Sequence, residues 1–273
     1  MNKSQDLRGR CAVVTGAASG IGRALAEELA ARGASLALID VNAPALERAA
    51  QPLSALAIAA DVRDEPAIAA AARRIEAELG AVELLFINAG VATVGPACTT
   101  PIEDVRWVLE VNAVGSIIVA RSFVPAMAAR RGGHVAFTAS LAGLIGAPGM
   151  SAYSASKFAL MGFAEALRVE LQGTNVSVTT VCPGYVRTGL HAATRYHHAG
   201  FRDFLDRAPN LLGLTAPQVA AATIDAACAG QPLLTLGPER IFFWLSRISP
   251  RAYAALASRG ARALGLFARE DAP

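Results

Sequence analysis

The sequence of 273 residues predicts an α/β fold, in which helices cover both faces of one doubly wound parallel sheet of about seven strands. Short apolar runs alternate with longer alanine-rich runs over the first two-thirds of the chain. The short runs are almost continuously hydrophobic, as in strands that are buried on both faces. Strands and helices that alternate in this way require right-handed crossovers, which favours a parallel sheet in a single domain.

The predicted strands are apolar runs bounded by turn residues. They are expected at residues 11–16, 35–40, 55–62, 84–90, 134–140, 176–184 and 233–237. The predicted helices lie between these strands, and several end at a glycine, which terminates helices readily. They are expected at residues 21–32, 43–51, 65–79, 102–131, 151–172 and 216–229.

The composition argues against several classes of protein. Hydrophobic residues make up 53% of the chain and charged residues 17%, as in a globular rather than a disordered protein. A net charge of +3 without a Lys/Arg-rich block gives no sign of nucleic-acid binding. No secretory signal is expected at the polar N-terminus, and no apolar run reaches the roughly 20 residues of a membrane helix. The four cysteines are far apart, which favours reduced thiols and a cytoplasmic protein.

The turn after the first predicted strand has the composition of a phosphate-binding loop. It reads TGAASGIG at 15–22, with Gly16, Gly20 and Gly22 between a strand and a helix. Small residues let the backbone approach a pyrophosphate, and the N-terminus of the helix attracts its negative charge. The same residues would also suit a tight turn without a ligand, but the strand–helix context favours dinucleotide binding.

Asp40 predicts which dinucleotide binds. It closes the second strand, 18 residues after Gly22, where a carboxylate can accept hydrogen bonds from ribose hydroxyls and repel a 2′-phosphate. Neither Val41 nor Ser19 offers a cation for such a phosphate, so NAD is favoured over NADP. Asp40 could instead cap the next helix, for which Asn42 is an equally good candidate.

The stretch YSASK at 153–157 places a phenol and an ammonium at positions i and i+4 of a predicted helix, on one face. A tyrosine has an ordinary pKa of about 10, and a nearby ammonium favours the phenolate and lowers that pKa. Ser140 ends the fifth strand, at the sheet edge where ligands of such folds bind. Tyr153 and Lys157 alone would be an ordinary exposed pair, but together with Ser140 and the glycine turn they predict acid–base chemistry.

In this order, the motifs resemble the short-chain dehydrogenase/reductase family in its classical type. The resemblance covers about residues 8–238 and depends on the glycine turn, NAG at 88–90, Asn112, Ser140, YSASK and PGYVRT at 183–188. It implies a single-domain, seven-stranded Rossmann-like fold. It also implies an NAD(H)-dependent oxidoreductase that interconverts a secondary alcohol and a ketone.

The resemblance assigns roles to four catalytic residues. Tyr153 is the acid/base, and Ser140 holds the substrate oxygen. Lys157 lowers the pKa of Tyr153 and holds the nicotinamide ribose, while Asn112 completes a water-linked proton relay to Lys157.

The residues expected to bind the cofactor follow from the motifs and the resemblance together. Asp61 and the backbone of Val62 are implied at the adenine ring, and residues 183–188 at the nicotinamide end. The full set is Gly16, Ser19, Gly20, Ile21, Gly22, Asp40, Asp61, Val62, Asn88, Ala89, Gly90, Tyr153, Lys157, Pro183, Gly184, Val186 and Thr188.

Residues 1–238 are thus expected to form the dinucleotide-binding and catalytic domain, with residues 187–213 as a substrate lid. Aromatic and leucine side chains in this lid suggest an apolar pocket wall and a hydrophobic substrate, although they could equally contact only the protein. No metal site is expected at the lid histidines. The side chains in question are His191, Tyr196, His197, His198, Phe201, Phe204, Leu211 and Leu212.

Residues 239–273 form an arginine-rich and alanine-rich extension that is expected to be helical and departs from the family pattern. Helices packed on the domain or on a partner subunit are favoured over a helix lying on a membrane surface, because Gly260 and Gly265 weaken a long amphipathic helix. A homodimer or homotetramer is expected, although the extension could cover the interface of a tetramer.

Two other functions remain open at the level of the sequence. A non-catalytic NAD(H)-sensing protein of the same fold is disfavoured, because Ser140, Tyr153 and Lys157 are all present. A sugar-nucleotide epimerase or dehydratase is disfavoured, because such relatives typically carry a larger C-terminal substrate domain.

Overall fold

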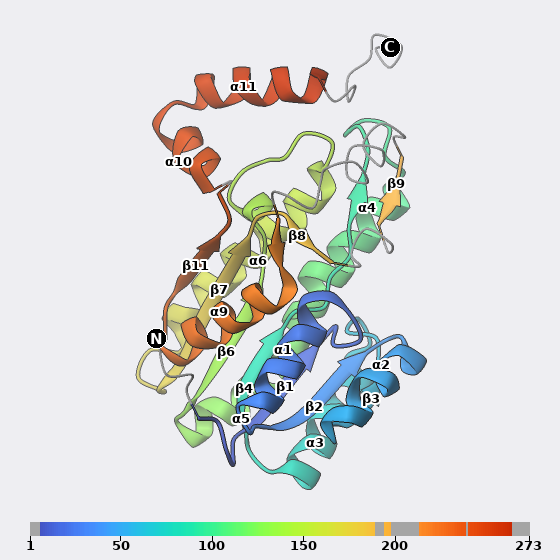
Figure 1. Cartoon of the computed structure of the whole chain (residues 1–273), viewed down its shortest axis with the longest axis vertical. Coiled ribbons are helices and arrows are strands. Elements are labelled where there is room, and N and C mark those ends of the chain that lie inside the picture. The colour runs from blue at the N-terminus through green and yellow to red at the C-terminus, as the bar shows by residue number, and fades with distance from the viewer. Residues whose placement is uncertain (1–5, 189–193, 198–212, 239, 264–273) are drawn as a thin grey trace.

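A computed structural model describes residues 6–188, 194–197, 213–238 and 240–263 (Figure 1). Its centre is a seven-stranded sheet in which every neighbouring pair is parallel, in the order β11-β7-β6-β4-β1-β2-β3. The predicted fold class is therefore confirmed. The strands are β1 (Cys11–Thr15), β2 (Ser35–Asp40), β3 (Leu56–Ala59), β4 (Val82–Ile87), β6 (Gly133–Thr138), β7 (Val176–Pro183) and β11 (Leu233–Leu236).

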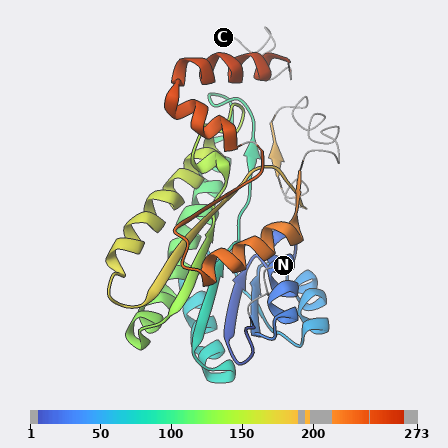
Figure 2. The same cartoon turned by 60° about the vertical axis from the view of Figure 1, so that its left-hand side comes forward.

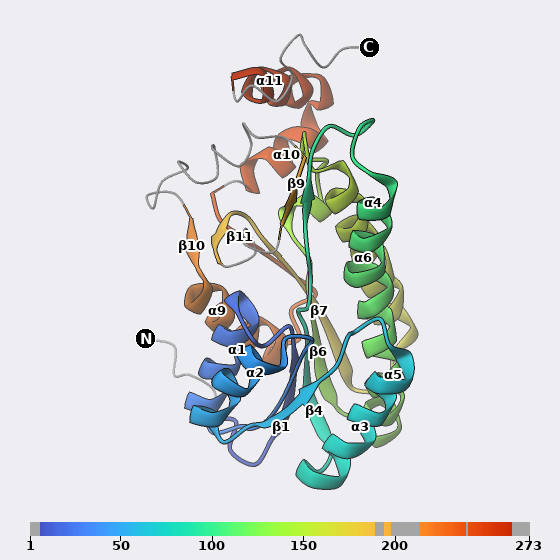
Figure 3. The same ribbon diagram turned by 90° about the vertical axis from the view of Figure 1, so that its right-hand side faces the viewer.

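Helices cover both faces of this sheet (Figure 3). The helices on one face are α1 (Gly20–Ala31), α2 (Ala43–Ala50) and α9 (Ala216–Cys228). The helices on the other face are α3 (Glu65–Leu79), α4 (Ile102–Leu109), α5 (Ser116–Arg130) and α6 (Ser151–Glu170). Short 3₁₀ turns occur at η1 (Gln51–Leu53) and η3 (Leu141–Gly143).

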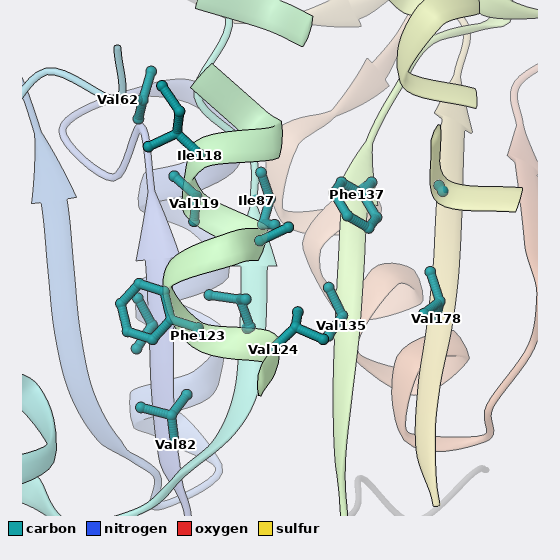
Figure 4. Close-up of a cluster of buried hydrophobic side chains, with 14 of the residues drawn as sticks. Val62, Val82, Ile87, Ile118, Val119, Phe123, Val124, Val135, Phe137 and Val178 are labelled. Carbon is teal, nitrogen blue, oxygen red and sulfur yellow. The ribbon is translucent and has the colours of Figure 1, made fainter. Parts of the chain in front are cut away.

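The larger part of the core lies between the sheet and helices α3, α5 and α6. Figure 4 shows Val119 and Phe123 of α5 beside the strands that carry Ile87 and Phe137. Phe123 is 2% exposed, and truncating such a phenyl group to alanine costs about 3–5 kcal/mol. This packing fixes the carboxyl ends of the central strands, where the candidate site lies.

Predicted boundaries differ from the structure by up to three residues, as for the strand expected at 84–90, which is β4. Two of the differences have a physical reason. The strand expected at 55–62 is confined to β3, because it lies at the edge of the sheet and pairs only with β2. The helix expected at 102–131 is interrupted between α4 and α5 by a π-helical turn, η2 (Glu110–Gly115). Nothing in the sequence marks this turn, since it contains no proline and ends at a glycine that the helix tolerates.

The helical segment Ile102–Arg130 is long and apolar enough to cross a membrane by length and composition. However, 56% of the most apolar stretch of this segment is buried inside the fold, where it covers the sheet. We therefore describe it as a core helix.

Two short parallel ribbons lie above the carboxyl ends of the strands, and the sequence did not predict them. In one ribbon β5 (Thr93–Val94) pairs with β9 (Arg195–Tyr196). In the other β8 (Val186–Arg187) pairs with β10 (Leu214–Thr215). They hold the described parts of the 187–213 segment over this edge of the sheet.

The C-terminal extension contains two helices, α10 (Arg240–Ile248) and α11 (Pro250–Ala263). Both lie at one end of the molecule, beyond the carboxyl ends of the strands (Figures 1 and 2). The prediction of a helical extension is thus correct for residues 240–263.

Candidate active site

The glycine turn joins β1 to α1 as a tightly packed loop. Gly16 and Gly20 have φ angles of +67° and +56°, which side chains rarely allow. A Cβ atom on Gly22 would lie 2.1 Å from the carbonyl oxygen of Gly16. Gly16 and Gly20 line the cavity described below, whereas Gly22 does not, so Gly22 allows close packing of the turn rather than contact with a ligand.

Thr15 fixes the end of β4 against this turn, and sequence reasoning missed it. Its hydroxyl accepts hydrogen bonds from the backbone N–H groups of Asn88 (3.0 Å) and Ala89 (3.1 Å). The Asn88 amide donates back to the Thr15 carbonyl at 3.2 Å. The only signal in the sequence was a hydroxyl residue directly before the first glycine. As a result, Asn88, Ala89 and Gly90 are held along one wall of the cavity.

Asp40 lies at the carboxyl end of β2 and also lines the cavity. Its two carboxylate oxygens accept the N–H groups of Ala18 (3.0 Å) and Asn42 (2.9 Å). Asn42 caps α2 by accepting the N–H of Ala45 at 3.1 Å, so the capping role belongs to Asn42. Asp40 instead ties the glycine turn to the second strand, and its oxygens retain lone pairs for a further donor.

A cation that the sequence argument overlooked lies near Asp40. Arg63 lines the cavity and forms an ion pair with Asp61 at 2.6 Å and a longer one with Glu110 at 3.7 Å. The hydrogen bond from Arg63 holds the pKa of Asp61 below its usual value. Because Arg63 is paired with two carboxylates, it is a weak candidate for binding a 2′-phosphate.

Tyr153, Lys157 and Ser140 come together at the centre of the cavity. Tyr153 and Lys157 lie in the first turns of α6 and are 8% and 3% exposed. Ser140 stands at the start of η3, where its hydroxyl accepts the N–H of Ala142 at 3.1 Å. The Lys157 ammonium lies 5.7 Å from the centre of the Tyr153 ring and donates to the Thr138 carbonyl at 2.9 Å.

The electrostatics of this group differ from the expectation. Burial raises the pKa of Tyr153 to about 12, and the nearby Ser140 side chain only partly opposes the shift. Burial likewise lowers the pKa of Lys157 to about 8. In the protein alone, therefore, the pKa of Tyr153 is raised and not lowered as expected, because desolvation is the largest influence on it.

Asn112 lies in the π-helical turn η2, behind the cavity wall rather than in it. Its amide oxygen accepts the N–H of Val91 at 2.8 Å, and its amide nitrogen donates to the Val91 carbonyl and to the Ser156 hydroxyl, both at 2.9 Å. Ser156 in turn donates to the backbone carbonyl of Tyr153 at 2.7 Å. The buried amide thus connects η2 to the start of α6. Ser156 is a further residue that the sequence did not identify.

Apart from Gly22, all the residues expected to bind the cofactor line one cavity of about 710 Å³. Their order follows the order of the strands in the sheet. Asp40 ends β2 and Asp61 comes after β3, the glycine turn comes after the neighbouring β1, and the segment after β7 lies farther along with Tyr153 and Lys157. The residues of that segment that line the cavity include Pro183, Gly184, Val186 and Thr188. A carboxylate, a cradle of backbone groups and a buried ammonium along one elongated cavity suit a dinucleotide in chemistry and in size.

The substrate end of the cavity, beyond Tyr153, is apolar. Its described lining contains no Asp, Glu, Lys or Arg apart from Lys157 itself. The residues that form it are Val91, Ala92, Val94, Trp107, Leu141, Ala142, Ile145, Ala147, Met150, Tyr185 and Thr194.

A group of charged residues fastens the described part of the lid to α4, and no motif in the sequence indicates it. Asp104 is 5% exposed and pairs with Arg195 and, at 2.6 Å, with His197. Burial opposes ionisation of Asp104, but the two hydrogen bonds hold its pKa below the usual value. The Arg195 guanidinium also lies 3.9 Å from the centre of the Trp107 ring, a cation–π contact. We call Asp104, Trp107, Arg195 and His197 the lid clamp.

Of the side chains singled out in the lid, Tyr196 and His197 are described, and the other six lie outside the described part of the chain. His197 is used in the clamp, and Tyr196 packs beside Val94. Among the described residues there is no group of three or more potential metal ligands. The residues outside are His191, His198, Phe201, Phe204, Leu211 and Leu212.

Comparisons with known proteins agree with this geometry. A family model described as short chain dehydrogenase matches residues 10–199. SadH of Mycobacterium tuberculosis is 36% identical over 265 residues, which cover 92% of this chain and 95% of SadH. The 1-deoxy-11-beta-hydroxypentalenate dehydrogenase of Streptomyces exfoliatus is also 36% identical, over 87% of this chain and 83% of that protein. A solved short chain dehydrogenase/reductase from Burkholderia phymatum in complex with NAD superposes with a TM-score of 0.84 and 32% identity, covering 90% of this chain and 96% of that one.

Proposed function

This chain belongs to the short-chain dehydrogenase/reductase family, and we propose that it uses NAD(H) to interconvert an apolar secondary alcohol and its ketone. Family membership makes it an oxidoreductase of a small molecule with NAD or NADP as its cofactor. The preference for NAD, the class of substrate and the catalytic roles below are our inferences. One observation carries the catalytic roles: Ser140, Tyr153, Lys157 and the glycine turn share a single cavity.

The proposed proton transfer depends on Tyr153. In the oxidation direction its phenolate takes the hydroxyl proton of the alcohol, and in reduction its phenol returns that proton to the ketone oxygen. Ser140, which lines the same cavity as Tyr153, holds the same substrate oxygen and so fixes its distance from the phenol. When bound, NAD accepts the hydride from the carbinol carbon and brings a positive charge into the site.

Lys157 supports this transfer in two ways. Its ammonium is anchored by the Thr138 carbonyl and retains donors for the hydroxyls of a ribose. Its positive charge opposes the desolvation that raises the pKa of Tyr153. Lys157 and Asn112 both border Gly90, since a Cβ atom there would lie 3.4 Å from the ammonium and 3.3 Å from the amide oxygen. This proximity supports a proton relay between them through water.

The preference for NAD is inferred from Asp40. A carboxylate at the end of β2 suits the two ribose hydroxyls and repels a 2′-phosphate. The one cation nearby in the described lining, Arg63, is already paired with Asp61 and Glu110. The Burkholderia phymatum relative, solved in complex with NAD, adds support.

An apolar substrate is inferred from the described lining beyond Tyr153, where Trp107, Ile145 and Met150 contribute to the wall. A charged substrate would be left without a partner on this wall, at a large desolvation cost. The Streptomyces exfoliatus relative is named for the dehydrogenation of a hydroxypentalenate, which supports a carbinol substrate; because that molecule is also a carboxylate, it gives no support to the uncharged class. A homodimer or homotetramer, a cytoplasmic location and a division of the chain at residue 238 stay predictions.

The test is a panel of secondary alcohols of increasing size, each with a carboxylated analogue, assayed for NADH formation and again with NADP. We expect turnover with bulky uncharged alcohols, little with their carboxylated analogues, and a preference for NAD. A preference for NADP would overturn the cofactor assignment, and a preference for the carboxylated members would overturn the substrate class. Tight NADH binding without turnover on any alcohol or ketone would instead support the non-catalytic sensor.

A further inference from the structure

Helix α10 carries its apolar stripe on the outside of the molecule. Ile241, Trp244 and Ile248 are spaced i, i+3 and i+7, which places them on one face of the helix. Their exposed fractions are 66%, 61% and 82%. Large apolar side chains that gather on an exposed face mark an interaction surface far more often than single exposed ones do.

The charge of this region has one sign. Residues 240–263 contain five arginines and neither aspartate nor glutamate. Arg240 and Arg247 directly precede Ile241 and Ile248 along the helix, so they border the apolar stripe. The remaining three, Arg251, Arg259 and Arg262, are exposed on α11.

Both helices are fastened to the protein by their opposite faces. Phe243 of α10 packs against the main core. The Tyr253 hydroxyl of α11 donates to the Gly146 carbonyl at 2.7 Å, and Ala261 is buried beside Val94. These contacts hold the apolar stripe and the arginines away from the fold. Gly260 does not interrupt α11, which weakens the sequence argument against a surface helix here; Gly265 lies outside the described residues.

We propose that the outer face of α10 and α11 docks on an anionic lipid bilayer. Aliphatic and tryptophan side chains enter the interface between headgroups and acyl chains, while arginines beside them bind lipid phosphates. We call Arg240, Ile241, Trp244, Arg247 and Ile248 the docking face.

A second copy of this chain fits the same face poorly. A two-fold symmetric contact places the same patch on both partners. Arginines of one copy would then meet arginines of the other, and the described part of both helices has no acidic side chain to offset them. An anionic surface removes this conflict, because it supplies the opposite charge.

Docking would bring the substrate end of the cavity close to the membrane. Ala261, Val94 and Met150 pack together, and Val94 and Met150 also line the cavity. If the proposed function holds, this arrangement suits an apolar alcohol that partitions into lipid. The docking itself does not depend on the reaction and is tested without it.

The test is cosedimentation of the full-length protein with phosphatidylcholine vesicles, with and without phosphatidylglycerol. We expect binding to the anionic vesicles and little binding to phosphatidylcholine alone. The double variant Arg240→Glu/Arg247→Glu should weaken binding more than about tenfold, because each cation near an anionic surface contributes roughly fivefold. Ile241→Ser/Ile248→Ser should weaken it as well. Val169→Ser, which removes an apolar side chain that is 62% exposed on α6, is the matched control and should bind like the wild type.

Fluorescence gives a second readout, because the chain has only two tryptophans, Trp107 and Trp244. In the Trp107→Phe variant the emission of Trp244 should shift to shorter wavelength when anionic vesicles are added. No shift and no cosedimentation would overturn the proposal, and so would equal binding by the docking-face variants and the wild type. Sedimentation velocity tests the alternative that a second copy of the chain binds this face. If the wild type is an oligomer and the Ile241→Ser/Ile248→Ser variant is a monomer, a second copy covers the docking face and the lipid proposal is overturned.

Discussion

The two ends of the cavity are built in different ways. The cofactor end belongs to the central sheet. Its geometry comes from the glycine turn and from two side chains that accept backbone N–H groups, the hydroxyl of Thr15 and the carboxylate of Asp40. The substrate end is bordered by the two-residue ribbons and the lid clamp, and α11 packs behind its Val94 and Met150. Tyr153 and Lys157 stand where the two ends meet.

We therefore expect the binding of the cofactor and the selection of the substrate to depend on separate parts of the cavity. Changes at the cofactor end disturb the packing of the sheet, because the same contacts hold strands and turn together. Changes at the substrate end act on side-chain contacts above the sheet and leave the sheet intact. The variants below test this separation, and they are ordered from the largest expected effect to the smallest.

The largest effect is expected from Gly22→Ala at the cofactor end. Its Cβ would lie 2.1 Å from the Gly16 carbonyl oxygen and 2.7 Å from the Asn88 amide nitrogen, so the turn must open. We expect a loss of at least about 3 kcal/mol in the free energy of unfolding, together with loss of NADH binding. Gly162→Ala, on α6 with open space around it, is the control and should be neutral or slightly stabilising. Urea unfolding and NADH titration measure both variants, and a Gly22→Ala protein as stable as Gly162→Ala would contradict the packing argument.

Lys157→Met tests how strongly burial lowers the pKa of Lys157, which stands where the two ends of the cavity meet. The pKa of Lys157 is lowered from 10.5 to about 8, so between these values the unfolded chain binds more protons than the folded protein. This lysine therefore makes the folded state more stable as the pH rises through that range. Relative to Lys157→Met, the wild type should gain about 2 kcal/mol between about pH 7.5 and about pH 9.5. Urea unfolding at both pH values measures this gain. If the wild type and Lys157→Met differ in free energy of unfolding by the same amount at both pH values, the ammonium is not desolvated.

Asp104→Asn tests the lid clamp at the substrate end. Asparagine keeps the shape of the side chain but removes the charge that holds Arg195 and His197. We expect KM for the best alcohol to rise about tenfold, with a smaller change in kcat and an unchanged Kd for NADH. Glu103→Gln, an exposed neighbour on α4, is the matched control. An equal loss of NADH affinity would mean that the two ends of the cavity are not separable.

The smallest effect is expected from Asp40→Asn. The asparagine amide can replace one of the two carboxylate oxygens that accept N–H groups, but not both. Because it is uncharged, it no longer repels a 2′-phosphate. The ratio of NADPH to NADH dissociation constants should fall several-fold, up to about tenfold, with modest loss of NADH affinity. A ratio that does not change would assign the discrimination to another residue at this end.

The cofactor end was largely predictable from the sequence, because local signals and tertiary contacts agree there. Helix α3 begins and ends as predicted, with Asp64 capping its start and Gly80 following its end. Strand β2 was also correct at both ends. The glycine turn was recognisable because its residues are constrained by the backbone, whatever the surroundings.

The substrate end was much less predictable, because its contacts join distant residues without a repeating pattern. The ribbons have two residues per strand, too few for a strand signal. Asp104 and Arg195 are 91 residues apart in sequence, and neither stands in a motif. The tyrosine pKa was misjudged for a related reason: spacing reveals the neighbouring ammonium, but only the fold reveals how completely both groups are buried.

The central claim is that Tyr153 transfers the proton while NAD takes the hydride, and single-turnover kinetics test it most directly. Enzyme saturated with NAD is mixed with the best alcohol of the panel, and NADH formation is followed in the wild type and in Tyr153→Phe. We predict that Tyr153→Phe slows NADH formation at least about a hundredfold while the Kd for NADH stays within about twofold. Hydride transfer at nearly the wild-type rate in Tyr153→Phe would contradict the account.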